Sequence, residues 1–125
     1  MSSSKGGKRE DLGIFVRSSW EANYARYLNW LKSRKEILEW KYEPVTFEFP
    51  VKKGTRFYTP DFEVHNPDGR VEYHEVKGWN HPKGKTALAR MAKYHPSIPI
   101  IMIDKPVYMQ LRKEMGRIIP NWEGL

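Results

Sequence analysis

The sequence predicts one domain with an α/β fold, in which helices flank a mixed central sheet. Its 125 residues are enough for a single hydrophobic core but too few for two domains. Segments with apolar residues at helical spacing alternate with segments rich in β-branched and aromatic residues. The expected order of elements is α-β-β-β-α-β-α, which is typical of a mixed sheet covered by helices.

The first part of the domain is expected to form a helix followed by a β-rich region. Residues 19–34 carry apolar residues on one helical face, and Ser18 and Glu21 have the spacing of a capping box with Ser18 as the N-cap. The apolar residues of this face are Trp20, Tyr24, Tyr27, Leu28 and Leu31. Segments 37–43 and 45–51 then alternate in part between apolar and polar residues, as strands do.

The best candidate for a β-hairpin joins residues 56–65 to residues 70–78. Its turn is Asn66-Pro67-Asp68-Gly69. Proline at the second position and glycine at the fourth suit a type I turn closed by a glycine bulge. Such a turn pairs Asn66 with Arg70 and thereby sets the register of the two strands.

The last third of the chain is expected to contain a helix, a strand and a second helix. Residues 85–95 have helical periodicity, whereas residues 98–103 form a short apolar run that predicts a buried central strand. A final helix is expected over residues 105–115, where Gly116 ends it.

The register of the hairpin brings two acidic residues together. With Asn66 opposite Arg70, Asp61 lies opposite Glu75, with Cβ atoms about 5 Å apart, and Lys77 shares the face of Glu75. Two such carboxylates repel each other, whereas a bound divalent cation turns the repulsion into ligation. The alternatives are a solvated face of mixed charge, or a register shifted by one residue, which would separate the two acids.

Composition favours a polyanionic partner. The chain has 22 Lys and Arg against 15 Asp and Glu, a formal charge of +7, and nucleic acid is the commonest partner of such chains, although an inert basic surface is the alternative. The absence of cysteine excludes disulfides and thiolate zinc sites. We expect an intracellular, cytoplasmic protein, because no signal peptide or membrane span is visible. We also expect no nucleotide cofactor, because the sequence has no nucleotide-binding signature. Residues 1–12 are expected to form a flexible basic arm ahead of a single domain over residues 13–125.

The residues around these acids resemble a known superfamily. Pro60-Asp61 followed by Glu75-Val76-Lys77 resembles the PD-(D/E)xK nucleases, whose core has the order αβββαβ. Longer segments, within residues 15–104, resemble the bacteriophage endonuclease I family of Holliday junction resolvases and related small phage endonucleases. These segments are Val16-Arg17-Ser18-Ser19-Trp20-Glu21, Tyr58-Thr59-Pro60-Asp61-Phe62 and Glu75-Val76-Lys77-Gly78-Trp79. The resemblance implies a restriction-endonuclease-like fold.

The resemblance also implies the site residues. Asp61 and Glu75 would bind Mg²⁺, or Mn²⁺ in its place, together with the main-chain carbonyl of Val76. Glu21 would complete the catalytic and metal site from the first helix, although capping alone would also explain this residue. Lys77 would orient the attacking water and offset negative charge in the transition state.

The function implied by the resemblance is that of a metal-dependent endodeoxyribonuclease acting on branched DNA in recombination. Because resolution of a junction needs two coordinated cuts, a homodimer is implied. The alternatives are a sequence-tolerant or nicking phage endonuclease and, in another class, a non-catalytic DNA-binding module on the same fold. Basic residues around the motif would grip DNA phosphates. They are Arg17, Lys52, Lys53, Arg56, Lys83, Lys85, Arg90 and Lys93.

Overall fold

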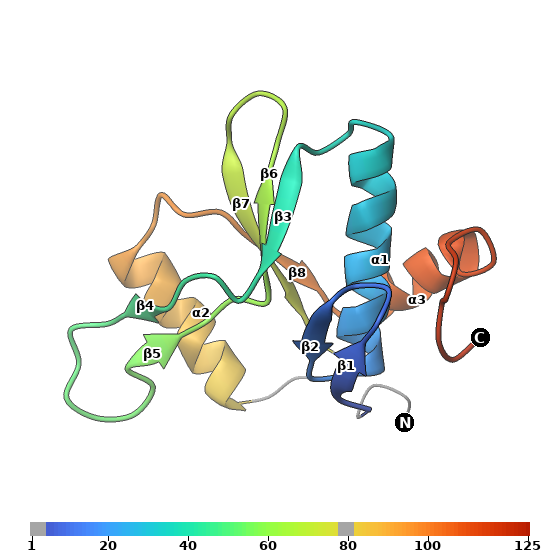
Figure 1. The fold of residues 1–125 in the computed structure, drawn as a ribbon. Helices are drawn as coiled ribbons and strands as arrows, with labels where there is room; N and C mark the ends of the chain where they lie inside the picture. The colour runs from blue at the N-terminus through green and yellow to red at the C-terminus, as the bar shows by residue number, and fades with distance from the viewer. Residues whose placement is uncertain (1–4, 78–81) are drawn as a thin grey trace.

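The computed structural model describes residues 5–77 and 82–125, and over these residues it has a mixed α/β fold with three helices (Figure 1). The helices are α1 (Ser19–Ser33), α2 (Pro82–Tyr94) and α3 (Lys105–Met115). In the described residues, no helix is long and apolar enough to cross a membrane.

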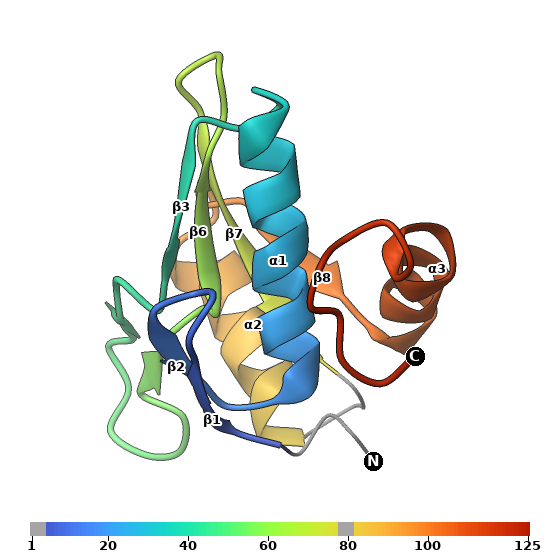
Figure 2. The ribbon, with the colours of Figure 1, turned by 45° about the vertical axis from the view of Figure 1, so that its right-hand side comes forward.

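The main sheet lies between α1 and α2. It consists of β3 (Glu39–Tyr42), β6 (Phe62–His65), β7 (Val71–Val76) and β8 (Ile100–Ile103), in the spatial order β3-β6-β7-β8. The pairs β3–β6 and β6–β7 are antiparallel, whereas β7 and β8 are parallel. A parallel pair needs a long crossover connection, and α2 lies within it. Figure 2 shows α1 running along the sheet, with α2 behind it.

Two hydrophobic clusters fill the space between these layers. One face of the sheet packs against α1, where Tyr24 and Leu28 meet Phe62 and Val64. The second cluster lies on the side of α2. Its buried residues are Phe49, Tyr58, Ala87 and Met91. Because successive side chains of a strand point to opposite faces, the sheet can contribute to both clusters at once.

The predicted first helix is confirmed, and its N-terminus has a modified capping arrangement. The Ser18 hydroxyl accepts a hydrogen bond from the Glu21 main-chain N–H at 3.1 Å, as an N-cap should. The Glu21 carboxylate accepts from the main-chain N–H of Arg17, also at 3.1 Å. The return bond of the capping box therefore comes from the residue before the cap, which leaves the carboxylate free to contact other elements.

The predicted hairpin turn and register are also confirmed. The main-chain N–H of Asn66 donates to the carbonyl of Arg70 at 2.9 Å, and the N–H of Gly69 donates to the carbonyl of Asn66 at 3.0 Å. Gly69 has φ +89°, a left-handed conformation that suits glycine at a bulge. The resulting register pairs Phe62 with His74 and places position 61 opposite position 75, as the turn predicts.

Several strand predictions need correction. The expected single strand over residues 56–65 is divided into β5 (Phe57–Tyr58) and β6, because proline at position 60 cannot donate to a ladder and the chain changes sheet there. The segment 45–51 contributes only β4 (Phe47–Glu48), which pairs with β5 in a separate two-stranded sheet. The expected central strand β8 lies at the edge of the main sheet, where Ile101 is exposed.

The expected flexible arm differs from the structure over its described part. Gly7–Arg9 forms strand β1, which pairs with strand β2 (Ile14–Val16) in a two-stranded hairpin. Arg9 anchors this hairpin through an ion pair with Glu123, 2.6 Å between Nε and Oε2. Residues 1–4 of the expected arm lie outside the described residues.

Candidate active site

The predicted site residues meet at one end of the main sheet. Asp61 directly precedes β6, Glu75 lies near the end of β7, and Glu21 lies in the first turn of α1. All three carboxyl side chains are buried, with 6 or 7% of each residue exposed. Three ionisable groups of the same sign in one buried region are rare unless they have a function or a counter-ion.

Asp61 and Glu75 are held by hydrogen bonds to their neighbours. Asp61 Oδ2 accepts from the main-chain N–H of Val76 at 2.8 Å, across the start of the hairpin ladder. Glu75 Oε1 accepts from the Tyr58 hydroxyl at 2.8 Å, and Glu75 Oε2 lies 3.5 Å from the Lys77 ammonium. The structure therefore brings together Asp61, Glu75 and Lys77, which the sequence predicts as neighbours.

Glu21 approaches the same region from α1. The Tyr42 hydroxyl donates a hydrogen bond to Glu21 Oε1 at 2.5 Å, in addition to the bond from the Arg17 main chain. Burial raises the pKa of Glu21, although these two hydrogen bonds lower it, and the nearby charge of Glu75 also raises it. Glu21 thus acts electrostatically on the Asp61–Glu75 pair as well as within the cap.

Burial raises the pKa values of the clustered acids, and mutual repulsion adds to this effect at Asp61. Burial raises the pKa of Asp61 to about 9, and the charges of Glu75 and Glu21 act in the same direction. Burial also raises the pKa of Glu75, against the hydrogen bond from Tyr58 and the charge of Lys77. The Lys77 ammonium pairs with Glu75 but leaves the repulsion at Asp61, which a divalent cation would offset.

The donor chemistry of the site fits a hard cation such as Mg²⁺. Asp61, Glu75 and the carbonyl of Val76 would supply only oxygen ligands. Within residues 5–77 and 82–125, no group of three or more His, Asp or Glu side chains is arranged to hold a metal ion as it stands. The predicted ligand set includes a third carboxylate, Glu21, and in the described residues Glu21, Asp61 and Glu75 are not arranged together around one metal position.

Two tyrosines at the site are absent from the sequence prediction. Tyr58 orients Glu75 and Tyr42 orients Glu21. Burial raises the pKa of both phenols well above the usual value, so each acts as a hydroxyl donor at neutral pH. Tyr58 stands in the Tyr58-Thr59-Pro60-Asp61 segment, but no local pattern connects it to Glu75, which approaches it only through the fold.

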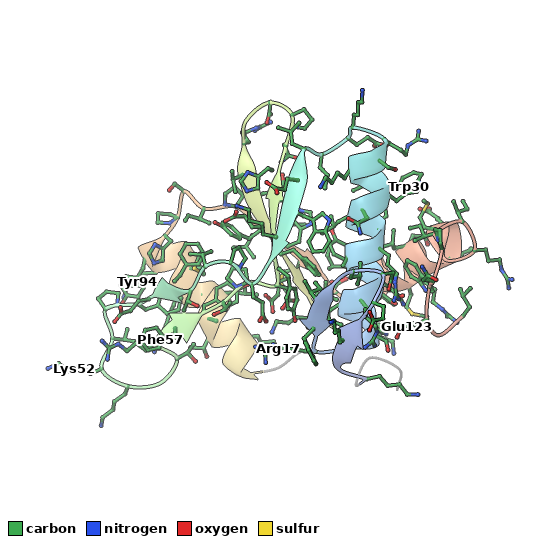
Figure 3. The ribbon with its side chains drawn as sticks, in the orientation of Figure 1. Arg17, Trp30, Lys52, Phe57, Tyr94 and Glu123 are labelled. Atoms are coloured by element: carbon green, nitrogen blue, oxygen red, sulfur yellow. The ribbon has the colours of Figure 1, made fainter. Side chains whose placement is uncertain are left out.

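The predicted DNA-binding residues differ in what they contact. Lys52 and Lys53 are exposed in the loop between β4 and β5, and in Figure 3 Lys52 points away from the body of the protein. Arg56 pairs with Glu48 at 2.7 Å. Arg17 pairs with Glu43 at 2.8 Å but remains largely exposed. All four residues are exposed to solvent.

The predicted DNA-binding residues of α2 fall into two groups. Lys85 and Lys93 are exposed, whereas the guanidinium of Arg90 donates hydrogen bonds to the carbonyls of Lys53 and Thr55. Arg90 therefore holds the β4–β5 loop against α2. The side chain of Lys83 lies outside the described residues.

Comparisons with known proteins identify no relative. The chain matches no protein-family model, and neither a curated protein nor a solved structure is significantly similar to it.

Proposed function

We propose that this chain is a Mg²⁺-dependent endodeoxyribonuclease of the PD-(D/E)xK superfamily with a restriction-endonuclease-like fold. The observation that carries the proposal is the buried Asp61–Glu75 pair with the Lys77 ammonium 3.5 Å from Glu75. The order of α1, β3, β6, β7, α2 and β8, with the last strand parallel to β7, supports the same assignment.

Each residue has a distinct role in the proposed reaction. Asp61, Glu75 and the Val76 carbonyl would hold Mg²⁺, which when bound polarises the scissile phosphate and neutralises its charge. Lys77 orients the attacking water and stabilises negative charge in the transition state. Tyr58 fixes the Glu75 carboxylate so that it faces the site. Glu21 supplies a further carboxylate from α1.

The proposed substrate is branched DNA such as a Holliday junction, and the proposed assembly is a homodimer in the cytoplasm. The support is the similarity of three sequence segments to phage junction resolvases, together with the net charge of +7. A nicking or sequence-tolerant endonuclease is a second candidate, because the buried acidic site suits any phosphodiester hydrolysis.

A cleavage assay tests the proposal. The protein is incubated with a four-way junction, a nicked duplex and a linear duplex, with Mg²⁺ or with a chelator. We expect Mg²⁺-dependent cuts confined to the junction, and a loss of at least about 100-fold in Asp61→Asn. Cutting of all three substrates would favour the nicking enzyme, whereas binding without cutting in any divalent metal would leave a DNA-binding module.

Thermal unfolding tests metal binding at the proposed site without DNA. At about 100 times its Kd, Mg²⁺ should raise the Tm of the wild-type protein by about 10 °C. Asp61→Asn should lose this shift and, without metal, should be more stable than the wild type, because one of the repelling carboxylates is gone. Glu39→Gln, which changes an exposed acid on β3, is the matched control and should keep the shift.

A further inference from the structure

A pocket of about 210 Å³ opens beside the candidate active site. Its lining includes two residues of that site, Glu75 and Lys77. Phe57 of β5, Thr59 after it, and Gly84 and Ala87 in the first turns of α2 also line the pocket. The lining therefore combines aromatic and small side chains with one carboxylate and one ammonium group.

Phe57 is an exposed aromatic residue of the pocket lining. The residue is 56% exposed, whereas its neighbour Tyr58 is buried and donates to Glu75, as the alternation of a strand requires. Phe57 is labelled in Figure 3 on β5, between the loop that carries Lys52 and the main sheet. The Arg56 guanidinium lies over the ring, 5.3 Å from its centroid. An exposed aromatic ring next to cationic groups is the usual platform for an unstacked nucleobase.

The residues of α2 that line the pocket have small side chains. Gly84 and Ala87 are three residues apart, so they share one face of α2 and expose little side chain there. The Lys77 side chain lies next to Gly84, since a Cβ placed on Gly84 would lie 2.5 Å from its ammonium nitrogen. The ammonium lines the pocket while it lies 3.5 Å from Glu75, so it stands between the pocket and the active site.

We propose that this pocket binds one unpaired nucleotide next to the scissile phosphate, with its base stacked on Phe57 and its phosphate near Lys77. A base within an intact duplex is stacked on both faces and cannot offer one of them to a protein ring. The preferred substrate class is therefore DNA with an unpaired nucleotide at the cleavage point, such as a branch point, a flap or a single strand. This inference rests on the proposed function, because the pocket shares Glu75 and Lys77 with the proposed active site.

Binding measurements without cleavage test the pocket. The two probes are a short DNA single strand with one 2-aminopurine and the duplex of the same sequence. Each probe is titrated with the Asp61→Asn protein and with double variants that combine Asp61→Asn with Phe57→Ala, Phe57→Leu or Phe15→Ala. Both Phe57 changes should weaken single-strand binding about tenfold and abolish quenching of 2-aminopurine, while duplex binding stays the same. Phe15→Ala changes another exposed phenylalanine, 70% exposed on β2, and should alter neither.

The outcomes separate this inference from the proposed function. Equal weakening of single-strand and duplex binding, or unchanged quenching in Phe57→Ala, would overturn the nucleotide pocket even if the wild-type protein cuts DNA. If the Phe57 changes abolish quenching but the wild-type protein cuts no DNA, the result would support the pocket and count against the nuclease. Because Phe57 is exposed, its variants should keep the wild-type Tm, and leucine retains an apolar side chain as a second check on folding.

Discussion

At the level of single residues, the position of Lys77 depends on a glycine in the facing helix. A Cβ at Gly84 would lie 2.5 Å from Lys77 Nζ and 3.1 Å from its Cε. The end of a lysine side chain is flexible, so it can move away from an added methyl group at little cost. That movement would separate the ammonium from Glu75, whose carboxylate lies 3.5 Å away.

Gly84→Ala should therefore separate stability from activity. Alanine is about 1 kcal/mol better than glycine within a helix, so the free energy of unfolding should rise by up to this amount. Cleavage should nevertheless fall about 100-fold, because a displaced catalytic group loses its alignment. Urea unfolding and single-turnover cleavage measure the two effects. In a Lys77→Ala background, which serves as the control, Gly84→Ala should cause no further loss of cleavage. A Gly84→Ala protein that cuts at the wild-type rate would contradict the proposal that Gly84 positions Lys77.

At the level of secondary structure elements, the turn between β6 and β7 determines which side chains meet. Asp61 and Glu75 face each other because the turn at Asn66 to Gly69 fixes the ladder, and a slip by one residue would separate them. Gly69 is the residue on which this turn depends, since its φ is +89°. A methyl group added to Gly69 would have no other atom within 4 Å. Any cost of substitution there comes from the backbone alone.

Gly69→Ala should lower the free energy of unfolding by about 1 kcal/mol, because alanine adopts a positive φ at a cost. Gly69→Asn should cost less, since asparagine tolerates the left-handed region. Urea unfolding of both variants checks the order. An alanine variant as stable as the wild type would mean that the turn does not require this conformation.

Across the molecule as a whole, an ionic network joins both ends of the chain to α1. Glu123 pairs with Arg9 of β1 and with Arg26 of α1, which also pairs with Asp11. Figure 3 places Glu123 beside β1 and the lower part of α1. The buried amide of Asn23 adds hydrogen bonds to the main chain of Glu123. The C-terminal segment thus closes over α1 and holds the N-terminal hairpin in place.

The network predicts a specific dependence of stability on pH. Burial alone would raise the pKa of Glu123, but hydrogen bonds from Arg9 and Arg26 outweigh it and lower the pKa to about 2. A lowered pKa in the folded state stabilises the fold above the pKa of the unfolded chain, about 4.3, and this stabilisation is lost as the pH falls towards 2.

Glu123→Gln should therefore be less stable than the wild type at pH 7, by about 2 kcal/mol after a discount for partial exposure to solvent. The difference should shrink between about pH 4.3 and pH 2, where the wild-type carboxylate is protonated. Urea unfolding across this range measures it, with Glu39→Gln as the control at an exposed acid. A difference that stays constant over the whole range would exclude ionic stabilisation by Glu123.

The features that depend on local interactions could be predicted from the amino-acid sequence. The apolar stripe and the Ser18 cap define α1, and the turn from Asn66 to Gly69 defines the hairpin. Because the turn sets the register, the meeting of Asp61 and Glu75 was predictable from residues close to them in the chain. The nuclease function remains a proposal that extends from this local pattern.

The features that depend on distant segments emerged only from the folded chain. Tertiary packing places β8 at the edge of the sheet and separates β5 from β6 at the proline before Asp61. It also brings the Tyr42 and Tyr58 hydroxyls to the carboxylates that they orient. It also fixed Gly7–Arg9 as a strand through Glu123, 114 residues from Arg9. Turns and caps are set by neighbouring residues, whereas strand order and long-range ion pairs depend on how the entire chain packs.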